Sequence, residues 1–123
     1  MTQTVARVVL PPTPVAARRA RQVVARQCGA WDTDVVDTAL LLTSELVTNA
    51  VMHGHSDVQL QVCTDGGLLR VDVGDDNSRF PRQQPAGPNA LDGRGLQIVQ
   101  LLATRWGVDE EPIGKTVWFE LDL

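Results

Sequence analysis

The sequence from residue 38 to residue 52 reads TALLLTSELVTNAVM. It contains one charged side chain, Glu45, among residues that are otherwise apolar or small and uncharged. Such a segment is typical of a helix that is largely buried in a core. Asp32 or Thr33 is a suitable N-cap, so we expect one long helix from there to His53.

The residues before this helix predict a strand and a shorter helix. Residues 5–10 are mostly apolar and β-branched, and two prolines end the strand that they form. Thr13 and Pro14 then favour a helix start, and Gly29 favours a helix end after Cys28. At helical spacing this segment has one apolar side, with Ala16, Ala20, Val23 and Val24, and one basic side, with Arg18, Arg19 and Arg26.

The residues after the long helix predict a hairpin, a loop, a third helix and further strands. Residues 58–63 and 68–73 alternate with period two around Asp65-Gly66-Gly67, which is a hairpin turn signal. Residues 75–95 are rich in Pro, Gly, Gln and Asn and predict a mobile loop, and residues 96–106 predict a helix. A short strand at Val108 and Asp109 and a last strand over 116–123 follow. The fold class is α+β: a two-layer sandwich whose mixed, mostly antiparallel sheet carries its helices on one face.

Length and composition suit one domain over residues 1–123, with 43% hydrophobic and 21% charged residues. The net charge of −4 argues against nucleic-acid binding, which needs an excess of basic side chains. No signal peptide and no run of the ~20 apolar residues that a membrane span needs is expected, so we predict a cytoplasmic protein with no membrane partner. Residues 1–31 carry five arginines and no acid, and this +5 segment suits an acidic partner.

Glu45 and Asn49 are the residues most suggestive of a site. They are four residues apart, so their side chains lie one above the other on the long helix, with His53 a turn further on. A carboxylate on an apolar helix is costly unless it is paired or faces a wet cleft, which favours a cleft wall. The plain alternative is that this side of the helix simply faces solvent.

Three further features are each weak alone. Gly93-Arg94-Gly95 precedes the third predicted helix, where backbone N–H groups can hold an anion. Asp75 ends a predicted strand, where its carboxylate can accept a hydrogen bond from the amine of a base. Thr116 opens the last strand and can offer a hydroxyl. Turn and strand preferences explain each of these equally well.

Several other kinds of site are absent from the sequence. There is no GxxxxGK[ST] phosphate loop, HExxH zinc helix or GxSxG nucleophile elbow. The soft metal ligands lack the spacing of a zinc site; they are Cys28, His53, His55 and Cys63.

The order of the motifs resembles a known family. SELVTNAVMHG, a hairpin ending in Asp75, a loop closing in GRGL, and GKTVWFEL resemble the nucleotide-binding fold of gyrase, heat-shock chaperone, histidine-kinase and mismatch-repair ATPases. The chain looks most like the short bacterial anti-sigma-factor serine kinases, over residues 12–123. The acidic motif of that superfamily reads DxGxG, whereas residues 75–79 read DDNSR and lack both later glycines.

The resemblance implies ATP and Mg²⁺ as ligands and assigns a role to each candidate. Asn49 would hold Mg²⁺, Glu45 would be the catalytic carboxylate, Asp75 would bind adenine, and Thr116 would support the adenine pocket. A phosphate lid over about residues 75–95 would include Gly93, Arg94 and Gly95. Nucleotide binding is further expected at His53, Asn77 and Leu96.

Three functions are compatible with these residues. The first is an ATP-dependent serine/threonine kinase and anti-sigma factor that phosphorylates an anti-anti-sigma protein and sequesters a sigma factor. The second is a non-catalytic, ATP-dependent protein-binding module, and the third is a plain ATP hydrolase. The family also suggests a homodimer.

Overall fold

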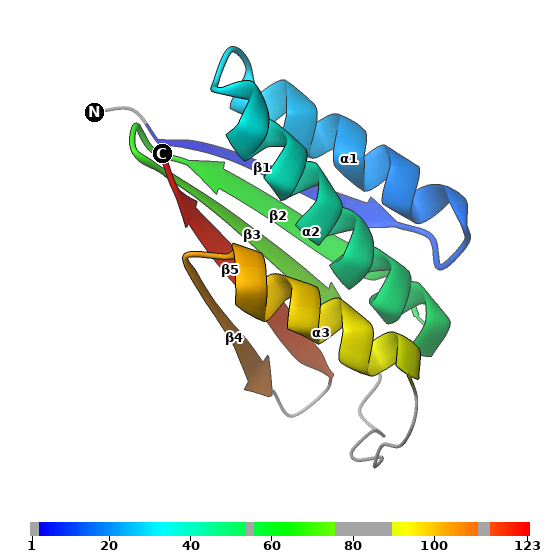
Figure 1. Cartoon of the computed structure of the whole chain (residues 1–123). Helices are drawn as coiled ribbons and strands as arrows, with labels where there is room; N and C mark the ends of the chain where they lie inside the picture. Colours follow the sequence, from blue (N-terminus) through cyan, green and yellow to red (C-terminus); the bar gives the residue numbers. More distant parts are fainter. Residues whose placement is uncertain (1–2, 54–55, 76–89, 111–113) are drawn as a thin grey trace.

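The computed structural model describes residues 3–53, 56–75, 90–110 and 114–123. It is a two-layer sandwich, with three helices on one face of a sheet (Figure 1). The five strands lie in the order β1-β2-β3-β5-β4, and every neighbouring pair is antiparallel. The predicted α+β sandwich is therefore confirmed, with a fully antiparallel sheet in the described residues. In chain order the elements are β1 (Thr4–Leu10), α1 (Val15–Cys28), α2 (Thr33–His53), β2 (Val58–Thr64), β3 (Leu68–Asp75), α3 (Ala90–Leu102), β4 (Arg105–Glu110) and β5 (Lys115–Asp122).

The ends of α1 and α2 follow local signals in the sequence. Asp32 caps α2, because its Oδ1 accepts a hydrogen bond of 2.8 Å from the backbone N–H of Asp34. Gly29 ends α1 with φ of 60°, a conformation that glycine adopts without a steric penalty. The first helical residue of α1 is Val15, so the helix begins one residue later than predicted. Pro14 precedes it with φ of −58°, and no side chain caps this end of the helix.

The β2–β3 hairpin is confirmed with slightly longer strands than predicted. Asp65 donates its backbone N–H to the carbonyl of Leu68 over 3.1 Å, which closes the turn. Gly66 lies in this turn with φ of 75°, a value that L side chains rarely adopt. The turn therefore sets the register in which Gln61 lies opposite Asp72.

The third helix differs from its prediction at both ends. It begins at Ala90, whereas the sequence predicts a loop over residues 75–95. Gly93-Arg94-Gly95 therefore lies inside α3 and not in a loop. It ends at Leu102, and Trp106 belongs to β4, where it pairs with Phe119 of β5. Hydrogen bonding to β5 outweighs the helical spacing that Trp106 shares with Leu102. Residues 76–89 of the predicted loop lie outside the described residues.

The core lies between the helices and one face of the sheet, which we call the helix face. Along each strand the side chains alternate between this face and the opposite, open face. On β3, for example, Leu69, Val71 and Val73 are buried while Arg70 and Asp72 are partly exposed. Each helix buries one of its sides in this core. The buried helix residues include Ala16, Ala20, Val24, Ala39, Leu42, Leu46, Val47 and Val99.

Helix α2 is long and apolar enough to span a membrane by length and composition alone, contrary to our expectation that no segment is. Its most apolar stretch has a mean hydropathy of 1.3. In the structure it is a core helix, with α1 on one side, α3 on the other and the sheet beneath it (Figure 1). Its composition thus reflects burial of one side against the sheet, although Leu41 and Met52 on the outer side are exposed.

The open face of the sheet carries a network of charged side chains. Arg70 pairs with Asp72 at 3.1 Å and with Glu120 at 3.2 Å, and Arg105 pairs with Glu120 at 2.6 Å and with Asp122 at 2.5 Å. Hydrogen bonds from Arg105 and Arg70 hold the pKa of Glu120 below its usual value. These pairs link β3, β5 and β4 across the sheet.

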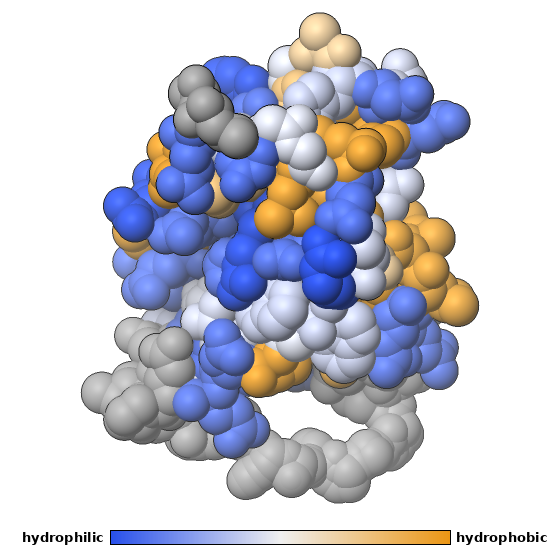
Figure 2. All heavy atoms as spheres, turned by 90° about the vertical axis from the view of Figure 1, so that its left-hand side faces the viewer, coloured by the Kyte–Doolittle hydropathy of each residue, from blue (hydrophilic) through white to orange (hydrophobic). Residues whose placement is uncertain are grey.

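Figure 2, which faces the side of the molecule where both termini lie, shows a surface that is mostly hydrophilic with separate hydrophobic patches.

Trp118 packs between strands on this open face. The guanidinium carbon of Arg70 lies 4.2 Å from the centre of the indole ring, a cation–π contact. The ring also lies against Gly107 of β4: a Cβ built on Gly107 would come within 2.6 Å of Trp118 Cζ2. Only glycine leaves room for the ring at this position.

We therefore predict that Gly107→Ala destabilises the fold by about 1–3 kcal/mol, because the indole or strand β4 must shift to admit the methyl group. Urea unfolding followed by circular dichroism measures this change. Gly67→Ala is the matched control, since a Cβ at Gly67 meets nothing within 4 Å. Equal stability of the two variants would contradict the packing described.

Candidate functional site

Four element ends converge at the end of the sandwich that lies away from the two chain termini. Helix α2 and strand β3 finish there, and helix α3 and strand β5 begin there (Figure 1). α2 also contacts both β3 and β5. Residues from distant parts of the sequence therefore meet at this end, which is where the sequence predicts a site.

Glu45 and Asn49 lie on the flank of α2 that turns away from α1. The opposite flank is marked by Ser44, whose hydroxyl accepts a 2.7 Å hydrogen bond from Arg21 of α1. At about 100° per residue, Glu45 and Asn49 are rotated from Ser44 by about 100° and 140°. This rotation directs both side chains to the side of α2 on which α3 lies (Figure 1).

Glu45 and Asn49 lie at the edge of the core in the described part of the chain. Both residues are half-buried, at the margin of the buried side formed by Leu42, Leu46 and Ala50. Among the described residues, neither side chain has a hydrogen-bond or ion-pair partner. A half-buried amide and carboxylate one turn apart, both without partners among the residues that the structure describes, fit a polar ligand. His53 is exposed at the last residue of α2.

Asp75 is the last residue of β3, and its side chain is only 4% exposed. In the sheet it lies directly opposite Lys115, the first residue of β5. The ammonium Nζ of Lys115 lies 3.5 Å from Asp75 Oδ2. Both residues are in phase with the buried residues of their strands, so the pair lies on the helix face.

Thr116 does not join this pair. It lies opposite Gly74, and its Oγ1 would be 3.2 Å from a Cβ built on Gly74, so both residues belong to the open face. Strand alternation thus places Thr116 on the other side of the sheet from Asp75. The predicted role of Thr116 in supporting an adenine pocket stays a prediction, and the residue that lies opposite Asp75 is Lys115.

Sequence reasoning gave no role to Lys115, although a signal was present. If β3 and β5 pair in antiparallel fashion, the end of one lies opposite the start of the other. Asp75 then lies opposite the start of β5, which the sequence places at residue 116 and the structure at Lys115.

The remaining predicted residues belong to α3 or fall outside the described part of the chain. Gly93, Arg94 and Gly95 lie in the first half of α3, and Leu96 is half-buried on the same helix. The end of α2 and the start of α3 occupy the same end of the sandwich (Figure 1). Asn77 lies outside the described residues.

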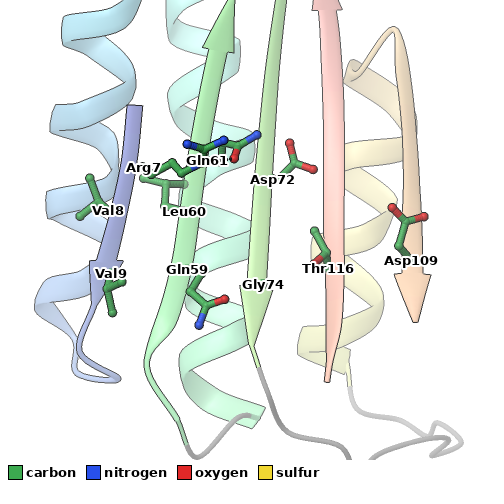
Figure 3. Close-up of a pocket in the computed structure, with 10 residues that line it drawn as sticks. All are labelled: Arg7, Val8, Val9, Gln59, Leu60, Gln61, Asp72, Gly74, Asp109 and Thr116. Atoms are coloured by element: carbon green, nitrogen blue, oxygen red, sulfur yellow. Dashed lines mark hydrogen bonds between the residues drawn. The ribbon is translucent and has the colours of Figure 1, made fainter. Parts of the chain in front are cut away.

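A separate hollow of about 470 Å³ lies on the open face (Figure 3). The residues that line it include Gln59, Asp72, Gly74, Asp109 and Thr116. At one side Arg7 donates a 2.7 Å hydrogen bond from Nε to Oε1 of Gln61. This hollow lies on the other side of the sheet from Glu45, Asn49 and Asp75, so the two regions do not form one site.

Soft metal ligands do not gather in the described part of the chain. No three His, Cys, Asp or Glu side chains come close enough there to hold a metal ion. Burial raises the pKa of the Cys28 thiol, and Cys63 is half-buried on β2. A cation such as Mg²⁺ at the Glu45–Asn49 flank would take its other ligands from water or from a bound group such as phosphate.

Two solved structures resemble the whole fold. The RsbU and RsbW domains of Rv1364c from Mycobacterium tuberculosis match with a TM-score of 0.75 and 21% identity, over 96% of this chain and 32% of that chain. The histidine kinase domain of the blue-light activated histidine kinase from Erythrobacter litoralis EL346 matches with a TM-score of 0.59 and 27% identity, over 92% of this chain and 61% of that chain. This chain thus spans less than two thirds of each of them. No curated protein matches it significantly.

A family model extends the similarity from structure to sequence. The model for the histidine kinase-like ATPase domain matches residues 10–121, which includes every strand and helix of the sandwich except most of β1 and the last residue of β5. The match spans the α2 flank, the Asp75–Lys115 pair and α3. The chain therefore belongs to the histidine kinase-like ATPase domain family.

Proposed function

We propose that this chain is an ATP-dependent serine/threonine kinase that acts as an anti-sigma factor in the cytoplasm. It would phosphorylate an anti-anti-sigma protein, sequester a sigma factor and form a homodimer. The observation that carries the proposal is the half-buried Glu45–Asn49 flank of α2, in a chain of the histidine kinase-like ATPase domain family. The structural resemblance to the RsbU and RsbW domains of Rv1364c supports the choice of this branch at the level of the fold.

The ligand that we propose is ATP with Mg²⁺. Its base would meet Asp75 on the helix face, and its phosphates would extend toward α2 and the start of α3. Mg²⁺ takes few protein ligands and keeps water and phosphate oxygens, so one amide oxygen from Asn49 suits it. Bound there, the ion would offset negative charge on the phosphates.

Glu45 is the residue that we propose for proton transfer. One turn from Asn49, its carboxylate would lie near the terminal phosphate and would accept the proton of the attacking serine or threonine hydroxyl. The hydroxyl oxygen would bond to the γ-phosphorus as the bond from that phosphorus to the bridging oxygen breaks, and ADP would leave. A positioned general base of this kind contributes roughly 10²- to 10⁴-fold to the rate.

Asn49→Ala should weaken Mg²⁺-dependent ATP binding by about tenfold or more, because it removes the amide oxygen that we assign to the ion. Calorimetry with and without Mg²⁺ measures the effect. Thr48→Ala is the matched control, since Thr48 is the exposed neighbour on α2. Unchanged Mg²⁺-dependent affinity in Asn49→Ala would remove Asn49 as the metal ligand.

Glu45→Gln should keep ATP affinity within a few fold and lower phosphate transfer by about two orders of magnitude, because it removes the base without changing the shape of the side chain. Transfer of labelled γ-phosphate to candidate anti-anti-sigma proteins measures the rate. A parallel loss of binding and transfer would assign a structural role to Glu45. Wild-type protein that binds ATP and transfers no phosphate to any of them would favour the binding module, which the missing glycines of residues 75–79 also suit.

The surface that we propose for the protein partner is the α1 arginine face, formed by Arg18, Arg19 and Arg26. All three are exposed on the side of α1 opposite its buried residues. Within the described chain, none of the three makes an ion pair. Arg21 does not belong to this surface, because it is half-buried and bonds Ser44.

Changing Arg18 and Arg19 together to Glu should slow association with an acidic partner and flatten its salt dependence, since the two arginines supply long-range attraction. Association rates with an identified sigma or anti-anti-sigma protein, at low and high salt, measure this effect. Changing both to Lys keeps the charge and should keep the rate. Melting temperature and ATP affinity should stay nearly constant, and equal rates for the Glu variant and wild type would exclude this face as the docking surface.

A further inference from the structure

Lys115 and Asp75 place a hydrogen-bond donor beside an acceptor at one point on the helix face. Their polar atoms are 3.5 Å apart, and the side chains are 34% and 4% exposed. The side chain of Asp75 is thus almost enclosed, while about one third of the Lys115 side chain is exposed. Lys115 is the only lysine in the chain, which has ten arginines.

The backbone of β5 holds Lys115 in this position. Gly114, which is buried, precedes it with φ of 87°, a conformation that L side chains rarely adopt. From Lys115 onward, β5 pairs continuously with β3, and Val117 and Phe119 face the helices in phase with Lys115. The direction of the lysine is therefore set by the same register that buries the core.

The pair is complementary to one edge of adenine. An ionised carboxylate only accepts hydrogen bonds, and an ammonium group only donates them. On its pairing edge adenine presents an amine, which donates, next to the ring nitrogen N1, which accepts. We propose that Lys115 reads adenine together with Asp75: the carboxylate accepts from the amine, and the ammonium donates to N1. This inference rests on the proposed function, because it takes Asp75 as the residue that meets the base.

Two simpler roles for Lys115 have different consequences. As a counter-ion for Asp75 alone, the lysine would affect ATP and an analogue changed only at N1 equally. As a phosphate ligand, it would affect ATP more than adenosine and would be insensitive to N1. A nucleotide that differs from ATP only at N1 separates these roles from base reading.

The experiment compares ATP with 1-deaza-ATP, in which a C–H group replaces N1. Wild-type protein should bind ATP about tenfold more tightly, the expected effect of one hydrogen bond from a charged donor. Lys115→Met, which keeps the length of the side chain without the donor, should bind the two nucleotides with equal affinity. Lys115→Arg should restore part of the preference, because it restores a donor.

Controls identify what each result means. Asp109→Asn, on the open face of the sheet, should keep the wild-type preference. A tenfold preference that persists in Lys115→Met would overturn the inference and leave ATP binding intact. Tighter wild-type binding of GTP than of ATP would overturn the assignment to adenine. Absence of ATP binding by folded wild-type protein would overturn the proposed function and the inference together.

Labelling of the wild-type protein gives an answer even if Lys115→Met fails to fold. An amine-reactive acylating reagent can modify Lys115 and the α-amino group, and mass spectrometry distinguishes the two. Saturating ATP should slow acylation of Lys115 about tenfold or more, and saturating 1-deaza-ATP should slow it less. Equal labelling of Lys115 with and without saturating ATP would contradict the contact with N1.

Discussion

Burial of one side of α2 against the helix face of the sheet is the contact on which the rest of the structure depends. Among the described helices, only α2 contacts all three of the strands β2, β3 and β5. It also packs against both α1 and α3. Its buried residues include Ala39, Leu42, Leu46 and Ala50. Small side chains among them let the helix approach the strands closely, and the larger ones fill the space between. Once this side is buried, the rotation of the helix is determined.

That rotation has a consequence for chemistry. Glu45 and Asn49 cannot turn toward α1 or into the core without moving Leu46 and Val47 out of it. Arg21 adds a polar contact that holds the α1 side in place. The rigid scaffold therefore positions two polar groups at the margin of the core, which is how precise sites are generally built.

Much of the architecture could be predicted from sequence because its signals are local. Asp32, Gly29 and Gly66 act within a few residues of themselves, and each ended or turned an element as expected. The apolar sides of α1 and α2 likewise follow from helical spacing alone. These features need no knowledge of distant partners.

The features that could not be predicted depend on strand pairing across the chain. Trp106 fits a helix when its neighbours in sequence are considered, but its hydrogen-bonding partner strand begins at residue 115. The phase of β5 decides whether Thr116 or Lys115 meets Asp75, and that phase follows from its pairing with β3. At the site, the α2 flank could be inferred from one helix, whereas the Asp75–Lys115 pair needed the register between two strands.

β4 forms one edge of the sheet, and the composition of this strand affects whether molecules associate through that edge at high concentration. An edge strand offers unpaired backbone groups to which a second chain can add. β4 has only six residues, and Arg105, Asp109 and Glu110 are exposed along it. The side chains of an added strand would lie close to a basic residue, Arg105, and to the acidic residues of β4. Charged groups among them would compete with the pairing of Arg105 to Glu120 and Asp122. The same ion pairs that join the strands of one molecule thus discourage growth of the sheet into a fibril.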